Sequence, residues 1–170
     1  MFAATDVQYL PGGGARAALV LASGAAFSPV VAEKTVLVSE VAPYQPGSFY
    51  RRELPCLRTV LAGALPHVEL LVIDGYVDLD PGGRPGLGAR AHEEFGVPVV
   101  GVAKTRFATA SHAIPVTRGQ AARPLYVTAA GLPLADAAAL VQAMSGEYRL
   151  PDALRRVDQL ARGLVQPRAA

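Results

Sequence analysis

The stretch that decides the fold is "VELLVID", Val68–Asp74, a short apolar run that ends in an acidic residue. A run of this length is typical of a strand buried on both faces of a parallel sheet. A helical pattern precedes it, so a right-handed crossover should bring it back parallel to an earlier strand. The first extended run, Met1–Leu10, is the natural central neighbour, and the ends of the two strands should therefore meet.

Extended runs rich in Val, Leu and Thr come before that helical pattern, separated by Gly, Pro and Ser, which indicates an antiparallel meander. They are Met1–Leu10, Ala15–Ser23 and Glu33–Ala42. Apolar residues at helical spacing predict a helix from Arg52 to about His67. Beyond Val68–Asp74 the pattern predicts a helix over Leu87–Phe95, a strand over Val97–Lys104, an edge strand over Ala122–Gly131, and helices over Pro133–Met144 and Pro151–Gly163. The expected fold class is α/β, a mixed sheet in which an antiparallel three-strand meander is followed by parallel strands, flanked by helices.

The length of 170 residues favours a single domain, residues 1–165, followed by a C-terminal tail, residues 166–170. The longest apolar run, Ala17–Phe27, is too short and too interrupted to cross a membrane. We see no basic start followed by a cleavage site, so we expect no secretory signal and a cytoplasmic protein.

Sixteen Lys and Arg against 14 Asp and Glu give a net charge of +2, which neither demands nor opposes a nucleic-acid partner. The single cysteine, Cys56, excludes an internal disulfide and is more typical of a small core residue than of a nucleophile.

Two aspartates, Asp6 and Asp74, lie where the first and fourth strands meet if those strands are neighbours. Like charges that close are unfavourable unless a cation lies between them, and hard divalent ions prefer oxygen ligands. The alternative is that each aspartate only starts a turn.

Two further carboxylates occupy positions that favour a role in the interior. Glu53 lies on the apolar stripe of its helix, although it would also suit the helix dipole as an N-terminal acid. Asp158 borders the apolar face of the last helix, where a carboxylate should be paired or bound to metal. Arg155 or Arg162 could instead pair with Asp158 at the surface.

Lys104 is one of two lysines in the chain and ends a predicted buried strand. It either supplies a compact ammonium at that point or reaches out to solvent. Other patterns fail as motifs. "DLDPGGRPG" has the aspartate spacing of a calcium loop, but its twelfth position is Ala89. "PGGGARA" lacks the Gly-Lys-Ser/Thr of a phosphate loop, and the histidines lie without ligand spacing.

The segment "PYQPGSFYRRELPCL", Pro43–Leu57, gathers prolines, aromatic residues and arginines ahead of a helix. Its first part, followed in order by "LLVIDG" and "VPVVGVAKTR", resembles signature segments of the endonuclease V family. The aspartate of "TDVQY" fits the same pattern. The resemblance covers nearly the whole chain, from Met1 to about Gly163.

The resemblance implies an RNase H-like fold and a Mg²⁺-dependent nuclease, with Mn²⁺ as a substitute, that acts in DNA repair. Its implied substrate is DNA with deoxyinosine, or RNA with inosine, cut one phosphodiester bond to the 3′ side. By matching positions, the resemblance implies metal ligation by Asp6, Asp74, Glu53 and Asp158, catalysis by Asp6, Glu53, Asp74 and Lys104, and nucleic-acid contacts by Tyr44, Pro46, Gly47, Arg52 and Gly75. In this interpretation Tyr44 is a wedge, and residues 75–88 wall a pocket for the displaced base.

The chain departs from the family pattern at a few positions. Asp80 stands where the family usually has a histidine, and Gly131 ends "TAAG" where the family tends to carry Ser-x-Gly-His. "RRELP" replaces Arg-Glu-Gly-Pro. Two alternatives stay open: a nuclease of the same fold with a changed substrate preference, and a nucleic-acid-binding module with weak or no catalysis. The sequence leaves open the oligomeric state and the choice between DNA and RNA.

Overall fold

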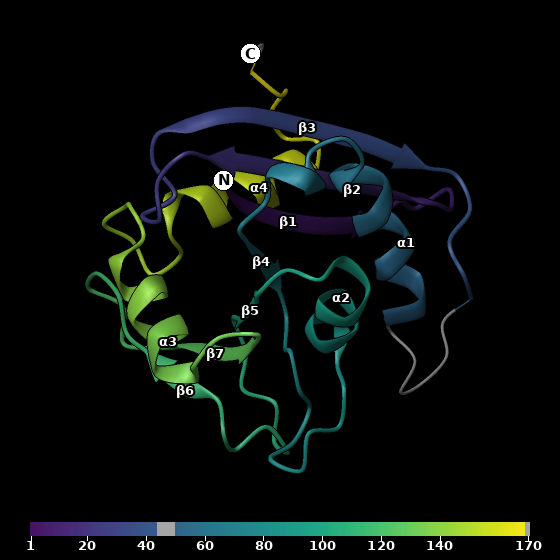
Figure 1. Ribbon diagram of the computed structural model, residues 1–170. Coiled ribbons are helices and arrows are strands. Elements are labelled where there is room, and N and C mark those ends of the chain that lie inside the picture. The colour runs from purple at the N-terminus through teal and green to yellow at the C-terminus, as the bar shows by residue number, and fades with distance from the viewer. Residues whose placement is uncertain (44–49, 169–170) are drawn as a thin grey trace.

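The computed structural model describes residues 1–43 and 50–168. Within them, seven strands form one twisted sheet in the order β3-β2-β1-β4-β5-β7-β6, with helices on both faces (Figure 1). The strands are β1 (Phe2–Tyr9), β2 (Ala15–Ala22), β3 (Val30–Val38), β4 (Leu70–Asp74), β5 (Val99–Ala103), β6 (Ile114–Val116) and β7 (Leu125–Ala130). The helices are α1 (Tyr50–Leu61), α2 (Leu87–Phe95), α3 (Leu134–Ala143) and α4 (Asp152–Ala161), with a 3₁₀ turn η1 (Leu65–His67).

The predicted centre of the sheet is confirmed. β1 and β2 pair antiparallel, β2 and β3 continue the meander, and β4 returns parallel to β1 with Thr5 opposite Ile73. β5 then pairs parallel to β4, and α2 lies between the two strands in the chain. This is the α/β arrangement expected from the apolar run and the crossover rule.

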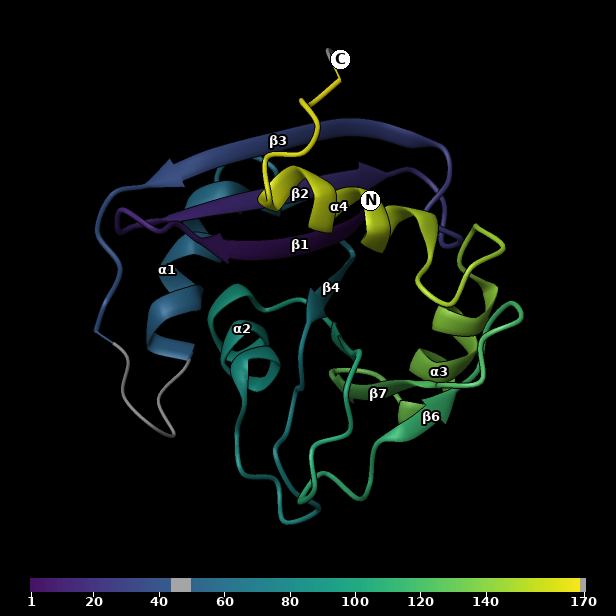
Figure 2. The ribbon, with the colours of Figure 1, turned by 180° about the vertical axis from the view of Figure 1, so that it is seen from behind.

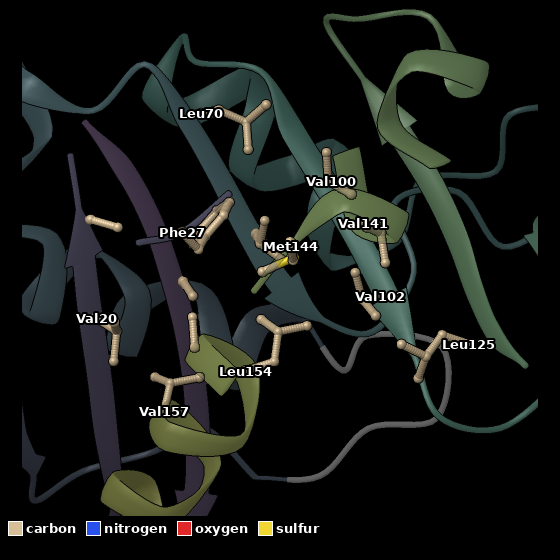
Figure 3. Close-up of a cluster of buried hydrophobic side chains, with 14 of the residues drawn as sticks. Val20, Phe27, Leu70, Val100, Val102, Leu125, Val141, Met144, Leu154 and Val157 are labelled. Carbon is tan, nitrogen blue, oxygen red and sulfur yellow. The ribbon is translucent and has the colours of Figure 1, made fainter. Parts of the chain in front are cut away.

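Two apolar layers hold the sheet. α1 and α2 cover one face, and α3 and α4 cover the other. β2 is buried along nearly all its length because its alternate side chains enter both layers. Figure 3 shows part of the second layer. Val20 of β2, Val157 of α4 and Met144, which follows α3, pack there with side chains from β5 and β7.

Some predicted boundaries are wrong. β3 covers Val30–Val38 rather than Glu33–Ala42, because its pairing with β2 starts opposite Ala22. β7 is not an edge strand, since β6 lies outside it. β6 has three residues including Pro115, too few to show any strand periodicity in the sequence.

An ion pair fixes α4 on the meander. Arg156 donates to both oxygens of Glu33 on β3, at 2.8 and 2.7 Å. The Glu33 side chain is only 1% exposed. The hydrogen bond from Arg156 holds the pKa of Glu33 below its ordinary value. Figure 2 shows α4 lying across β1 and β2, so this contact sets where the second half of the helix sits.

Within the two described ranges, every helix falls short of the length and hydropathy that a bilayer span requires.

Candidate active site at the carboxyl end of β4

The site forms where β4 ends and β1 continues. The parallel register pairs Thr5 with Ile73, so the next residues, Asp6 and Asp74, lie side by side. Asp158 approaches from α4 on one face of the sheet. One carboxylate oxygen from each of these three residues lies within 4.8 Å of the others. The expected adjacency of Asp6 and Asp74 is therefore present, and a third acid joins it.

Lys104 occupies the middle of this carboxylate cluster (Asp6, Asp74 and Asp158). It follows β5, and its ammonium lies 2.8 Å from Asp74 Oδ2 and 3.0 Å from Asp158 Oδ1. Arg162 Nε lies 3.0 Å from the other oxygen of Asp158, so the surface pairing considered for this residue also exists. Arg155 pairs with Asp152 instead.

Glu53 lies on the opposite face of the sheet, outside the group of three acids but near enough to feel the charges of Asp6 and Asp74. It lies in the first turn of α1 and is 7% exposed, as its place on the apolar stripe predicted. The hydroxyl of Tyr9 lies 3.3 Å from Glu53 Oε1 and donates to it. The guanidinium of Arg52 lies 4.0 Å from the centre of the Tyr9 ring. Tyr9 therefore links the end of β1 to the start of α1.

Burial and mutual repulsion disfavour the ionised forms of Asp6 and Glu53. Burial, and then the charge of Asp74, raise the pKa of Asp6 to about 7. Burial, and then the charge of Asp6, raise the pKa of Glu53 to about 8. Buried like charges disfavour ionisation, and a cation between them reverses that effect. Oxygen donors at this spacing fit a hard divalent ion.

The pKa of Lys104 reflects two opposed effects. Burial lowers it, but the hydrogen bonds and charges of Asp74 and Asp158 outweigh burial, so the pKa lies above its ordinary value. Lys104 is therefore a fixed positive charge among the acids.

Two arginines, one buried and one partly buried, support the backbone at Lys104. The guanidinium of Arg149 donates to the backbone carbonyls of Lys104 and Pro124. The guanidinium of Arg118, which is 4% exposed, donates to three carbonyls of the segment before Arg149. These are Met144, Gly146 and Tyr148. Sequence reasoning missed both arginines, because nothing in their local pattern shows which distant carbonyls they bind.

A cavity of about 410 Å³ adjoins Asp74 on the side of α1 and α2. Its lining residues are Tyr50, Asp74, Gly75, Tyr76, Leu79, Arg84, Pro85, Gly86, Leu87 and Phe107. The Tyr76 hydroxyl donates to Thr105 O at 2.8 Å and accepts from Phe107 N at 2.9 Å. The rings of Tyr76 and Phe107 lie 5.9 Å apart. We call this the aromatic pocket. Its walls come from residues 75–87, close to the range expected, and from Phe107, which sequence reasoning missed.

The remaining predicted positions fall into two groups. Gly75 lines the aromatic pocket, and Arg52 lies on Tyr9 beside Glu53. Tyr44, Pro46 and Gly47, the expected nucleic-acid contacts of the loop before α1, lie outside the described residues.

The positions that depart from the family pattern have local partners. Asp80 pairs with Arg84 at 3.3 Å and accepts from its backbone N–H at 3.2 Å. Gly131 lies against His92, and a Cβ at this position would come within 2.6 Å of the ring. Thr128, at the start of "TAAG", accepts a hydrogen bond from Val77 N at 2.8 Å, next to the aromatic pocket.

The sheet order and helix cover define an RNase H-like fold, with three clustered carboxylates at the end of β4 that could hold a metal ion. The chain belongs to the endonuclease V family, whose model matches residues 1–131. That range includes Asp6, Glu53, Asp74 and Lys104 but ends before α4.

Curated relatives extend the match along the chain. Endonuclease V of Streptomyces avermitilis is 34% identical, over 91% of this chain and 75% of its own length. Endonuclease V of Streptomyces coelicolor is 33% identical, over 91% of this chain and 74% of its own length.

Solved structures agree on the fold. The S. avermitilis endonuclease V crystal structure has a TM-score of 0.79 and 29% identity, covering 96% of this chain and 80% of its own. Human ENDOV has a TM-score of 0.76 and 23% identity, covering 96% of this chain and 83% of its own. Ciona intestinalis endonuclease V, solved with a DNA that contains an inosine followed by a ribo-adenosine, has a TM-score of 0.76 and 16% identity, covering 96% and 84%.

Proposed function

We propose that this protein is a Mg²⁺-dependent endonuclease, with Mn²⁺ as a substitute, that acts on nucleic acid containing deoxyinosine or inosine. It hydrolyses a phosphodiester bond to the 3′ side of that nucleotide, as an enzyme of DNA repair. The observation that carries the proposal is the position of the carboxylate cluster and Lys104 directly beside the aromatic pocket. One site can thus hold a base and cut the backbone next to it.

The acidic residues fit a divalent ion. Asp6, Asp74 and Asp158 would hold it, with Glu53 beside them. When bound, the ion supplies Lewis-acid stabilisation of the charge that builds on the phosphate during hydrolysis. The carboxyls of Asp6 and Glu53, with pKa values raised to about 7 and 8, lose their protons more readily when a cation approaches. Ion binding therefore releases protons near neutral pH.

Lys104 is suited to contact the phosphate. Its ammonium already lies among the acids at the end of β4, and Arg149 fixes its backbone. A positively charged group held at this point stabilises the negative charge of the reacting phosphate without reorganising.

The aromatic pocket is suited to a displaced base. A cavity of about 410 Å³ with Tyr76 and Phe107 on its wall offers stacking surfaces, and Gly75 leaves the backbone open to it. Extruding a base costs least where its pair is already weak, as with inosine. The Ciona relative's DNA contains an inosine, which supports this substrate class. Tyr44, Pro46, Gly47 and Arg52 would assist by filling the gap and contacting the backbone.

A second candidate is a nuclease of the same fold with a changed substrate preference. It is favoured by Arg84, which lines the aromatic pocket and is paired with Asp80, where the family usually has a histidine. The guanidinium of Arg84 can only donate hydrogen bonds to a base, whereas a neutral histidine can both donate and accept.

The test is cleavage of a labelled duplex with a single deoxyinosine, beside an unmodified duplex, in Mg²⁺, Mn²⁺ or EDTA. We expect a metal-dependent cut one bond beyond the lesion and none in EDTA. Uracil, abasic, mismatch, flap and inosine-RNA substrates distinguish the second candidate. Binding without metal-dependent cutting of any substrate would contradict both candidates and favour a binding module.

A further inference from the structure

Two guanidinium groups lie on the α4 side of the carboxylate cluster. Arg162 follows the last residue of α4, contacts Asp158 at 3.0 Å, and has a side chain that is 54% exposed. Arg16 lies on β2, and its guanidinium donates to the carbonyl of Ala161 at 3.5 Å. Both groups therefore sit around the C-terminal end of α4.

The strand register places Arg16 on the same face as Asp6. β1 and β2 pair Asp6 with Ala18 and Gln8 with Arg16. Residues two apart share a face and lie roughly 7 Å apart along a strand, which the long arginine side chain can span. Gly163 leaves room for the Arg16 guanidinium, because a Cβ there would overlap it.

The positions of the aromatic pocket and of the two arginines indicate the direction in which a bound strand would run. The aromatic pocket lies on the α1 and α2 side of Asp74, whereas Arg16 and Arg162 lie on the α4 side. Figures 1 and 2 show α1 and α4 on opposite faces of the meander. A strand with its base in the pocket and its scissile phosphate at the carboxylates reaches the α4 side if it continues along the same line.

We propose that Arg162 and Arg16 bind a backbone phosphate of that strand, beside the scissile phosphate on the α4 side. The inference rests on the proposed function. Guanidinium groups match phosphate oxygens through paired N–H donors. The partners that they would exchange are weak, because the Asp158–Arg162 pair is half-exposed and the Arg16 bond is long.

A salt titration of binding tests the proposal. The parent is Asp74→Asn, which we expect to bind without cutting, and its affinity for deoxyinosine and unmodified duplexes is measured by anisotropy over a range of salt concentrations. We expect Arg162→Gln and Arg16→Gln each to reduce the slope of log K against log [salt], and the double variant, which loses the whole contact with that phosphate, to reduce it by about 0.9, equally for both duplexes. Arg162→Lys should keep the slope. Arg58→Gln, which removes an exposed arginine of α1 that pairs with Glu94 on α2, is the matched control and should leave the slope unchanged.

The outcomes separate the two proposals. Slopes unchanged in Arg162→Gln and Arg16→Gln, with a parent that binds duplex, would overturn the phosphate site alone. If Arg162→Gln leaves the slope unchanged but alters the Mg²⁺ concentration that cleavage needs in the otherwise wild-type protein, Arg162 acts through Asp158. That result would overturn its phosphate role. A parent that binds no nucleic acid would overturn this proposal together with the proposed function. Thermal unfolding of each variant shows whether it is folded, and Arg162→Lys tests the charge without loss of the side chain.

Discussion

Lys104 and Asp158 are in contact, with 3.0 Å between Nζ and Oδ1, although 54 positions separate them in the chain. The contact joins the end of β5 to the second half of α4. Asp74 lies on the other side of the same ammonium at 2.8 Å. The protein therefore holds a permanent cation between two acids drawn from different elements.

Asp74→Asn should abolish metal-dependent cleavage while leaving the protein folded. The change replaces a charged carboxylate of the cluster by a neutral amide. We expect the rate to fall at least 10³-fold, which corresponds to about 4 kcal/mol of activation free energy. The free energy of unfolding should change little, since the lost repulsion from Asp6 offsets the lost ion pair with Lys104, and the Asp74 side chain is 37% exposed. Single-turnover cleavage and circular dichroism measure the two effects. Cleavage close to the wild-type rate would contradict the metal role of Asp74.

Lys104→Met should destabilise the protein more in EDTA than in Mg²⁺. Without the ammonium, Asp74 and Asp158 repel each other, and only an added ion can replace the lost charge. Melting temperatures of both proteins in each buffer measure the difference. Arg90→Met, which removes a cation that pairs with Glu93 and lies over the ring of Tyr50, serves as the control and should show no dependence on Mg²⁺. An equal loss in both buffers for Lys104→Met would count against a metal at this place.

The metal-free protein should lose stability as pH rises from about 5 to 8.5. The folded pKa values of Asp6 and Glu53, about 7 and 8, lie above their values in the unfolded chain. The folded state therefore binds more protons over this range, and its stability is present at low pH and lost as pH passes the folded pKa values. Urea unfolding in EDTA at several pH values measures the slope.

Glu53→Gln provides the matched variant for that slope. It keeps the size of the side chain and its contact with Tyr9 but cannot ionise. We expect a flatter pH dependence and a metal-free protein that is more stable than wild type at pH 8.5 by about 1–3 kcal/mol. Parallel slopes for the two proteins would show that Glu53 does not titrate in this range.

Arg149→Gln should lower both stability and turnover. It leaves the carbonyls of Lys104 and Pro124 without their guanidinium donor, at a cost of about 1–3 kcal/mol in unfolding free energy. Because Lys104 then loses its backbone support, kcat should fall more than KM rises. Arg155→Gln, an exposed residue paired with Asp152, should change stability by less than about 0.5 kcal/mol. Equal effects of the two substitutions would contradict the positioning role of Arg149.

Tyr76→Phe should weaken the selection of deoxyinosine. The variant loses the hydroxyl that bonds Thr105 O and Phe107 N, so the wall of the aromatic pocket loosens. We expect about a tenfold rise in KM, or 1.4 kcal/mol, for the deoxyinosine duplex with metal dependence unchanged. Tyr148→Phe, whose side chain is 62% exposed away from the pocket lining, is the control. A larger effect on metal dependence than on substrate selection would place Tyr76 with the carboxylate cluster instead.

The sequence predicted those parts of the site that depend on strand order and helical spacing. Asp6 and Asp74 meet because a crossover after a helix must return in parallel, and the chain offers one central neighbour. Glu53 is buried because it shares a helix stripe with Leu57 and Leu61. These inferences need only local periodicity and one handedness rule.

The rest of the site depends on contacts that no local pattern encodes. Asp158 reaches Lys104 because the apolar face of α4 packs on the sheet and its Arg156 pairs with Glu33, 123 positions away. The position of Lys104 also depends on Arg149, whose donors bind carbonyls that carry no sequence signal. The place of Tyr76 directly after "DG" could have suggested that it belongs to the site. No sequence pattern shows that Phe107 packs against its ring.

The ammonium among the acids also acts as a tethered competitor. An ion that binds Asp74 Oδ2 or Asp158 Oδ1 competes with Lys104 for that oxygen, and the lysine side chain cannot diffuse away. The affinity for metal should therefore be lower than the number of acids alone would indicate, and the ion should exchange readily. Occupancy of the site would then follow the free concentration of the ion around the protein.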